Sequence, residues 1–217
     1  MFTGLIEEVG QVKSINKGKN SAVITIAAKT VVEDTKVGDS IAVNGVCLTA
    51  TTVNSSYFTA DIMHESLDRS SLSNISSGDK VNLERAMSAD GRFGGHIVSG
   101  HIDGVGTITK IVKDDNAIWY YIDASKDIMK YIVEKGSIAI DGISLTVAKL
   151  NADSFAVSCI PHTVANTCLA YKKEGSIVNL ETDIIGRYVE RMMSFSSDKE
   201  DNNKSSITKE FLLKNGF

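Results

Sequence analysis

The sequence predicts an all-β-dominated protein made of two homologous barrel domains, and three observations predict it. The chain repeats itself, because residues 40–49 match residues 137–146 at an offset of 97 with six identities in ten positions. Segments such as 21–27 and 117–122 carry the apolar alternation or the β-branched and aromatic residues typical of strands. Short Gly, Asn and Asp turn signals separate the strand segments, and the chain holds one proline. This pattern favours closed barrels over a parallel sheet.

Two further matches support the duplication. Residues 81–84 and 178–181 both read Val-Asn-Leu-Glu at the same offset of 97, whereas residues 4–10 align with 100–106 at an offset of 96. A single short insertion or deletion accounts for the change of offset. The period is too long and the copies are too few for a solenoid, so we expect two globular halves.

Each half is expected to carry short turns and helices between its strands. Gly45 and Gly142 lie inside stretches that otherwise read as strand, so each predicts a tight turn or a bulge between two short strands. We expect short helices near residues 30–35, 65–72, 126–133 and 163–171.

After residue 183 the pattern becomes helical. Apolar residues recur at helical spacing over residues 184–195, and a helix of this kind needs a surface to pack on, which predicts an oligomer contact. These apolar residues are Ile184, Tyr188, Val189, Met192 and Met193. The predicted divisions are an N-terminal barrel at 1–96, a C-terminal barrel at 97–183, a helix at 184–195 and a polar tail at 196–217.

Composition excludes several classes of function. The net charge is −4 and no basic stripe is present, which argues against nucleic-acid binding. No apolar run approaches the ~20 residues that cross a bilayer, and the N-terminus lacks the pattern of a signal peptide, so we expect a cytoplasmic protein with no membrane partner. Three cysteines without Cys-x-x-Cys spacing predict neither a disulfide framework nor a zinc site.

Four segments carry a specific family resemblance. They are Met1-Phe2-Thr3-Gly4-Leu5-Ile6, Asn44-Gly45-Val46-Cys47-Leu48-Thr49, Gly94-Gly95-His96-Ile97-Val98-Ser99-Gly100-His101 and residues 135–146. In this order and spacing they resemble the riboflavin synthase family of the alpha-chain type over roughly residues 1–194. The resemblance implies two six-stranded antiparallel Greek-key barrels and a C-terminal helix that builds a homotrimer. It implies no metal and no organic cofactor, and lumazine synthase as a further partner.

The implied reaction is the last step of riboflavin biosynthesis. Two molecules of 6,7-dimethyl-8-ribityllumazine react, and a four-carbon unit passes from one to the other. The products are riboflavin and 5-amino-6-(D-ribitylamino)uracil. Two related barrels suit this reaction, because two related pockets that hold both reactants together replace a bimolecular encounter.

The resemblance also implies the site residues. The catalytic ones are Phe2, Cys47, His101, Asp141, Ser144 and Asp183. The N-terminal pocket is expected to use Thr3, Gly4, Leu5, Ile6, Cys47, Leu48, Thr49, Asp61, Ile62, Met63, His64, Glu65 and Ser66. The C-terminal pocket is expected to use Gly100, His101, Ile102, Lys135, Ser144, Leu145, Thr146, Ile160, Pro161, His162, Thr163, Val164 and Ala165.

Several roles follow as hypotheses. Ser144, Cys47 or a water molecule adds to C7 of the acceptor lumazine, and His101 is the natural proton shuttle. The carboxyl groups of Asp141 and Asp183 orient donors or assist proton transfer. Lys135 stabilises negative charge that develops on the ring. The repeat changes chemistry at matched positions, which points to different roles for the two pockets. These pairs are Cys47/Ser144, Asn44/Asp141, Leu5/His101 and Glu65/His162.

Other interpretations remain open. His96 and His101 form a His-x₄-His pair, but five residues apart on a strand places them on opposite faces, which disfavours a metal site. A free cysteine such as Cys47 is often a small core residue. A lumazine- or flavin-carrying antenna protein is the main competing function. Retention of polar groups in the C-terminal half favours the enzyme, and no signature supports a flavin-dependent reductase.

Overall fold

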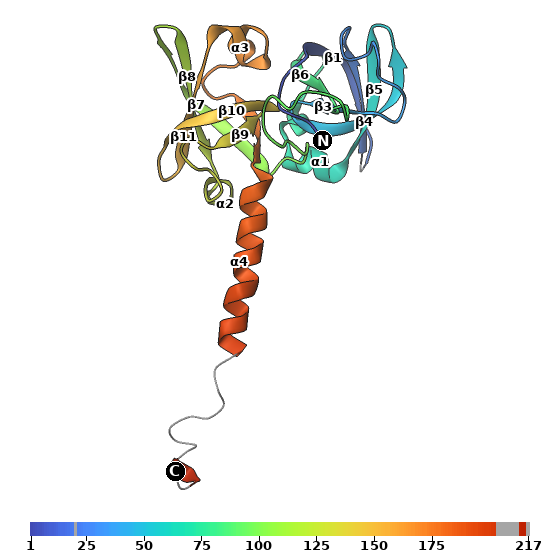
Figure 1. Ribbon diagram of the computed structural model, residues 1–217. Coiled ribbons are helices and arrows are strands. Elements are labelled where there is room, and N and C mark those ends of the chain that lie inside the picture. The colour runs from blue at the N-terminus through green and yellow to red at the C-terminus, as the bar shows by residue number, and fades with distance from the viewer. Residues whose placement is uncertain (20, 203–212, 216–217) are drawn as a thin grey trace. The chain divides into compact units, whose positions relative to one another are not determined.

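The computed structural model describes residues 1–19, 21–202 and 213–215, and the side chains through residue 194 and again at 213–215. The chain divides into two units, Met1–Ile184 and Ile185–Phe217. The first unit contains both barrels, which Figure 1 shows side by side.

The N-terminal barrel has six antiparallel strands. They are β1 (Glu8–Lys17), β2 (Ser21–Ala27), β3 (Ser40–Val43), β4 (Val46–Asn54), β5 (Tyr57–Met63) and β6 (Lys80–Arg85). The strands close in the order β1-β2-β5-β4-β3-β6. Because β2 pairs with β5 rather than with β3, the connection is of the Greek-key kind.

The C-terminal barrel repeats this arrangement. Its strands are β7 (Gly104–Asp114), β8 (Ala117–Ala124), β9 (Ser137–Ile140), β10 (Ile143–Leu150), β11 (Ser154–Cys159) and β12 (Ile177–Thr182). They close in the order β7-β8-β11-β10-β9-β12, which is the order of the first barrel six strands later. The predicted fold of two six-stranded antiparallel barrels is confirmed.

Short helices lie between the strands in three of the four expected places. They are α1 (His64–Arg69) with the 3₁₀ turn η1 (Ser71–Asn74), α2 (Lys126–Met129), and α3 (Pro161–Ala165) with the 3₁₀ turn η2 (Cys168–Tyr171). Each is shorter than expected. In two of the places a 3₁₀ turn takes the last residues of the predicted helix.

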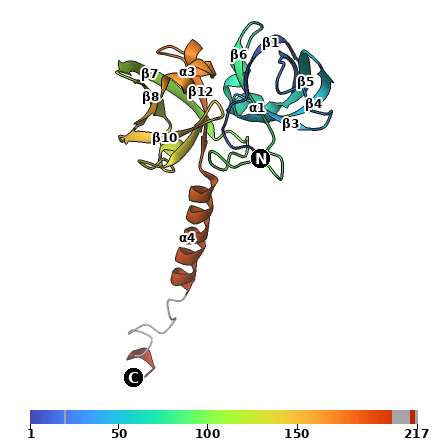
Figure 2. The ribbon, with the colours of Figure 1, turned by 45° about the horizontal axis from the view of Figure 1, so that its top comes forward.

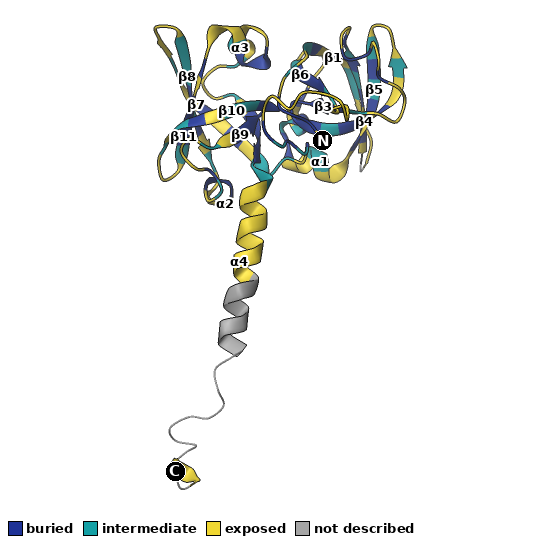
Figure 3. Cartoon of the chain, viewed as in Figure 1, coloured by how far each residue is buried: buried dark blue, intermediate teal, exposed yellow. Residues whose placement is uncertain are grey.

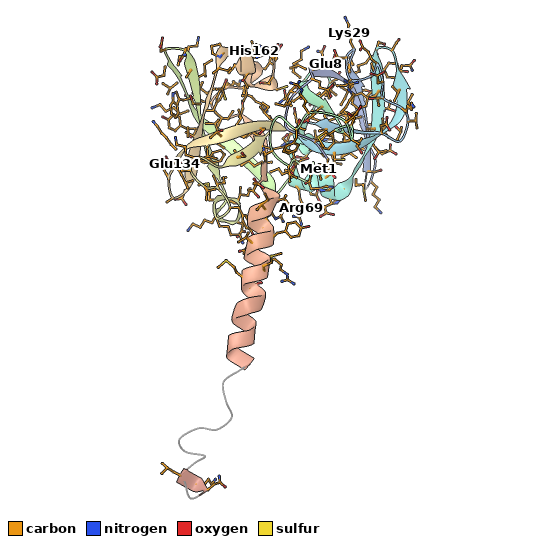
Figure 4. All side chains as sticks on the ribbon, in the orientation of Figure 1. Met1, Glu8, Lys29, Arg69, Glu134 and His162 are labelled. Atoms are coloured by element: carbon orange, nitrogen blue, oxygen red, sulfur yellow. The ribbon has the colours of Figure 1, made fainter. Side chains whose placement is uncertain are left out.

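The helix expected near residues 30–35 is wrong, because these residues form turns. The Glu8 carboxylate accepts the N–H groups of Lys29, Thr30 and Val31 at 2.7, 2.8 and 3.1 Å, and Figure 4 labels Glu8 and Lys29 together on this barrel. In a helix the Val31 carbonyl would accept the N–H of Thr35. Here it accepts the Thr35 hydroxyl instead. The β-branched run of residues 30–32 further disfavours a helix.

Each barrel encloses its own hydrophobic core. The first core contains the fully buried Ile24, Ile41, Phe58 and Leu83, among others. The second core contains Ile108, Ile122, Phe155 and Leu180, among others. Figure 3 shows these interiors as dark blue segments of the strands.

The two barrels meet at a pair of matched turns. Asn44 and Gly45 have φ angles of +46° and +81°, and Asp141 and Gly142 have φ angles of +44° and +80°. A Cβ atom on Gly45 would lie 2.8 Å from the backbone nitrogen of Gly142, so only glycine permits this approach. Both predicted tight turns are therefore present, and they face each other across the barrel interface, which Figure 2 views from a second angle.

Side-chain amides join the barrels around these turns. The Asn82 Nδ2 group donates to the Asp141 carbonyl at 2.9 Å, and the Asn179 Nδ2 group donates to the Asn44 carbonyl at 2.8 Å. The Oδ1 atoms of the same side chains accept backbone N–H groups of the opposite barrel, Asn82 from Cys168 and Asn179 from Ser71, each at 2.6 Å. Each asparagine of the Val-Asn-Leu-Glu repeat thus makes two hydrogen bonds to the other barrel.

The helix α4 (Ile184–Asn202) extends seven residues past the predicted end at 195 and so covers part of the predicted polar tail. Residues 185–194 of α4 are exposed in the single chain, as the yellow part of the helix in Figure 3 shows. They include Ile185, Tyr188, Val189, Met192 and Met193, which are 49–68% exposed. Residues 203–212 and 216–217 lie outside the described residues. Among the residues that the structure describes, no helix is long and apolar enough to cross a membrane.

Candidate functional site

The segments that precede the two barrels pair with each other. The Phe2 N–H donates to the Val98 carbonyl at 2.7 Å, and the Val98 N–H donates to the Phe2 carbonyl at 3.1 Å. Both side chains are buried and pack with Ala42, Ala139 and the half-buried Cys47. The repeat therefore places the N-terminus between the barrels rather than on one of them.

From this pairing, each segment continues to the opposite barrel. The Ser144 N–H donates to the Gly4 carbonyl at 2.8 Å, and the Cys47 N–H donates to the Gly100 carbonyl at 2.9 Å. Farther along, Ile6 packs against the C-terminal core and Ile102 packs against the N-terminal core.

The expected grouping of the segments is therefore wrong. Residues 4–6 lie against Ser144 in the C-terminal barrel, and residues 100–102 lie against Cys47 in the N-terminal barrel. Each predicted pocket is completed by the segment from the other half of the repeat. Because the two segments match each other, sequence alone fits either assignment.

Glycine permits the closest of these approaches. Gly4 and Gly100 have φ angles of +78° and +84°. A Cβ atom on Gly4 would lie 2.6 Å from the Ser144 Cβ, and one on Gly100 would lie 2.5 Å from the Cys47 Cβ. Residues 4–6 and 100–102 are named the crossing segments below. They contact Ser144 and Cys47, the two candidate nucleophiles indicated by the sequence.

Strand alternation turns these residues away from the barrel cores. On β4, Cys47 and Thr49 alternate with the buried Val46, Leu48 and Ala50. On β10, Ser144 is half-buried and Thr146 is exposed, whereas Val147 is fully buried. Each barrel thus presents one candidate nucleophile and one threonine hydroxyl on its outer face.

The segments after β5 and β11 are mostly exposed. Met63 is 74% exposed, and the His64 Nδ1 atom lies 3.0 Å from the Asp68 carboxylate one helical turn away. The predicted residue Ile62 is instead fully buried in the first core. Ile160, Pro161 and His162 are exposed at the matching place in the second barrel, where Figure 4 labels His162 on α3.

Ser144 has a partner that the sequence did not identify as part of the site. The His96 Nδ1 atom lies 2.7 Å from the Ser144 hydroxyl oxygen. His96 is 7% exposed, and its Nε2 atom has no hydrogen-bond partner among the described residues. Burial lowers the pKa of His96, and the charge of nearby Asp183 opposes this effect in part. The lowered pKa favours the neutral imidazole, and in the tautomer with its proton on Nε2 the Nδ1 atom can accept the Ser144 proton.

Asp141 and His101 occupy different surroundings. Asp141 is 1% exposed; its Oδ1 accepts the Asn179 N–H at 2.8 Å and its Oδ2 pairs with the Lys172 ammonium at 2.7 Å. Burial raises the pKa of the Asp141 carboxyl, and Lys172 opposes the rise. Both side-chain partners lie in the C-terminal half, whereas the Asp141 carbonyl accepts the Asn82 amide of the other barrel. His101 and Lys135 are both exposed.

No metal centre emerges from the described residues, in which no group of three or more His, Cys, Asp and Glu side chains could hold a metal ion. An open pocket of about 610 Å³ is lined by Thr3 and Leu5 together with Ser40, Glu84, Arg85 and others. It reaches neither the Cys47–Thr49 nor the Ser144–Thr146 segment. We therefore base the site on the crossing contacts rather than on this pocket.

Comparisons with known proteins agree with the duplication of the chain. The family model described as the lumazine binding domain matches residues 3–86 and again residues 99–183. The riboflavin synthases of Actinobacillus pleuropneumoniae and Bacillus subtilis (strain 168) are 55% and 46% identical to the chain over 217 residues, covering 100% of both chains in each case.

Solved structures of LumP are similar as well. The complex of LumP with 6,7-dimethyl-8-(1'-D-ribityl)lumazine has a TM-score of 0.77 and 26% identity, and it covers 84% of this chain and 99% of that chain. The complex of LumP with riboflavin has a TM-score of 0.77 and 27% identity over the same shares.

Proposed function

The chain belongs to the lumazine-binding domain family, and we propose that its two barrels each bind one of the two molecules consumed in a riboflavin synthase reaction. The protein is a transferase that moves a four-carbon unit between two molecules of 6,7-dimethyl-8-ribityllumazine. The products are riboflavin and 5-amino-6-(D-ribitylamino)uracil.

The observation that carries this proposal is the matched pair of crossing hydrogen bonds. The two hydrogen bonds give both barrels the same backbone arrangement at the same position. In one the Cys47 N–H donates to the Gly100 carbonyl, and in the other the Ser144 N–H donates to the Gly4 carbonyl. Strand edges beside these bonds offer N–H and C=O groups to the pyrimidinedione edge of a lumazine. The exposed hydroxyl groups of Thr49 and Thr146 supply further hydrogen bonds. A shared frame explains why one chemical species fits both sites.

Within this frame the two sites differ in their chemistry. In the C-terminal site, neutral His96 takes the hydroxyl proton of Ser144 while the Ser144 oxygen forms a bond to C7 of the acceptor lumazine. In the N-terminal site the matching residue is Cys47, whose N–H donates to the carbonyl of Gly100, the residue before the exposed His101. His101 takes the proton that leaves the C7 methyl group of the donor lumazine.

Other predicted residues support these two sites. The ring of Phe2 is fully buried against the Gly100–Cys47 contact and fixes it. Lys135 and Asp183 stabilise charge and orient donors near the C-terminal site. We give Asp141 a structural role, because its carboxylate binds Asn179 and Lys172 of its own half and its carbonyl accepts the Asn82 amide of the other barrel.

Assembly completes the proposal. The exposed apolar side chains of α4 provide a helical surface for a homotrimer. In this assembly the N-terminal site of one subunit faces the C-terminal site of its neighbour, so the two lumazines meet between subunits. We further propose a cytoplasmic location and lumazine synthase as the partner that supplies the substrate.

A cofactor-free assay tests the function. Purified protein is incubated with 6,7-dimethyl-8-ribityllumazine alone, and riboflavin is followed by its absorbance and green fluorescence. We expect two lumazine molecules consumed per riboflavin formed. Tight binding without turnover contradicts the enzyme and supports an antenna protein. Sedimentation of the same sample tests the trimer, which a monomer or a dimer contradicts.

A further inference from the structure

Two buried glutamates hold the crossing segments. Glu84 on β6 is 4% exposed; its Oε1 accepts the N–H and the hydroxyl of Thr3 at 2.6 and 2.8 Å, and its Oε2 accepts the Gly4 N–H at 3.0 Å. Both crossing segments are thus tied to a carboxylate, because the second barrel repeats the arrangement. Glu181 on β12 is 3% exposed; it accepts the N–H and the hydroxyl of Ser99 at 2.6 and 2.7 Å and the Gly100 N–H at 3.0 Å.

The far side of each held peptide contacts the opposite barrel. Glu84 of the N-terminal barrel binds Gly4 through its N–H, and the Gly4 carbonyl accepts the N–H of Ser144. In the same way, Glu181 of the C-terminal barrel binds Gly100, whose carbonyl accepts the N–H of Cys47. One glycine therefore separates each glutamate from the candidate nucleophile of the other barrel.

We propose that Glu84 and Glu181 are positioning residues that act across the barrels, Glu84 on the Ser144 site and Glu181 on the Cys47 site. The identity of the ligand rests on the proposed function, whereas the crossed dependence rests on the hydrogen bonds alone. Each site is then set by a carboxylate from the barrel that does not contain it, so neither barrel holds a complete site by itself.

The chemistry of a carboxylate makes this role specific. Each carboxylate accepts three hydrogen bonds from its segment, and charge-assisted bonds of this kind are stronger than neutral ones. Burial raises the pKa of both carboxyl groups, and the hydrogen bonds to their segments oppose the rise by favouring the charged form. A glutamine has the same size, but its amide nitrogen would face an N–H donor where the second oxygen now accepts.

The test compares Glu84→Gln with Glu181→Gln in the full chain. Amide hydrogen exchange is measured at the N–H of Ser144 and at the N–H of Cys47, without ligand. We expect Glu84→Gln to speed exchange at Ser144 by about tenfold or more and to leave Cys47 within about twofold, and Glu181→Gln to give the reverse pattern. Equal acceleration at both amides in both variants, or none at either, overturns the proposal.

Matched variants separate positioning from a general loss of stability. Glu7→Gln removes a carboxylate that binds Arg85 beside the same segment, and we expect it to leave the Ser144 amide unchanged. Thr3→Val and Ser99→Ala each remove one hydroxyl donor from a glutamate. If a glutamine variant does not fold, these milder variants should give the same crossed pattern at about threefold; no crossing in them overturns the proposal.

Repeating the exchange with saturating 6,7-dimethyl-8-ribityllumazine keeps the two proposals distinguishable. We expect the lumazine to protect both amides in the wild type and to lose its protection at Ser144 alone in Glu84→Gln. If each glutamine variant speeds exchange only in the opposite barrel but lumazine protects neither amide, the proposed ligand is contradicted and the positioning role stands. Protection of both amides in every variant, without crossing, supports the ligand and overturns the positioning role.

Discussion

At the scale of the residue, the surroundings of His96 determine how activity depends on pH. Burial holds the pKa of His96 below the ordinary value of ~6.5, so the neutral ring that accepts the Ser144 proton persists at pH 6.5. We expect kcat/KM to fall only when the pH drops through this lowered pKa. His96→Asn should remove the acidic limb and lower kcat by about 10²-fold or more.

The same shift has a consequence for stability, because the unfolded chain binds the proton first. As the pH falls below ~6.5, the unfolded state is protonated while His96 in the folded state stays neutral, so the free energy of unfolding decreases. The His96→Asn variant should lack this part of the decrease. An acidic limb of activity that is unchanged in His96→Asn would show that another group titrates.

Cys47 differs from the other two thiols in its accessibility. Cys159 and Cys168 are 2% and 1% exposed, and burial raises the pKa of each thiol to about 12. Cys47 is half-buried on the outer face of β4. We expect iodoacetamide to modify one thiol per native chain, and 6,7-dimethyl-8-ribityllumazine to slow this modification. Cys47→Ser, which copies Ser144, should abolish it, and mass spectrometry that finds Cys159 or Cys168 modified as fast would contradict the prediction.

At the scale of the element, the crossing segments depend on two glycines. Gly4→Ala combines a positive φ with a new Cβ only 2.6 Å from the Ser144 Cβ, and Gly100→Ala places its Cβ 2.5 Å from the Cys47 Cβ. Gly38→Ala is the matched control, because Gly38 has a φ of +97° but open space around its Cβ position. We expect the control to lose about 1–2 kcal/mol of stability and to keep its activity. Gly4→Ala and Gly100→Ala should lose more stability, measured by thermal unfolding, and should also lose riboflavin formation in the assay. Equal effects in all three variants would refute the role of the contacts.

The elements also show how far a sequence predicts this structure. The repeat and the strand patterns predicted both barrels, because alternation and turn residues act locally. The exchange of residues 4–6 and 100–102 was not predictable, since the two segments match and either pairing satisfies the pattern. The turns at residues 30–35 depend on Glu8, which lies more than twenty residues away in the chain. His96 was missed as a site residue because a single histidine in a glycine-rich linker has no periodic pattern that reveals its partner.

At the scale of the whole first unit, the duplicated interface is nearly symmetric but carries one charged pair. Asn44 in the N-terminal barrel matches Asp141, and Ile75 matches Lys172 at the same offset of 97. The Asn44 Oδ1 accepts the Asn82 N–H at 2.8 Å, and the Asp141 Oδ1 accepts the Asn179 N–H at the same 2.8 Å. Both halves therefore have this hydrogen bond, whereas only the C-terminal half has the additional ion pair between Asp141 and Lys172.

The repeat itself supplies the variant that tests this pair. Asp141→Asn keeps the acceptor for Asn179 but leaves the Lys172 ammonium, whose side chain is 18% exposed, without its carboxylate. We expect the free energy of unfolding to decrease by about 1–3 kcal/mol, because a partly buried charge loses its partner. Asp141→Asn/Lys172→Ile reproduces the Asn44 and Ile75 pair, so it should recover to within about 1 kcal/mol of the wild type.

Activity of the double variant then decides the role of Asp141, which the family resemblance counts among the catalytic residues. Since the carboxylate of Asp141 is held by Asn179 and Lys172 inside the C-terminal half, we expect Asp141→Asn/Lys172→Ile to form riboflavin at a rate close to that of the wild type. Denaturant unfolding establishes that the variant is folded before the assay. Loss of turnover at restored stability would assign the Asp141 carboxylate to the chemistry, because neither packing nor the ion pair would then explain the loss.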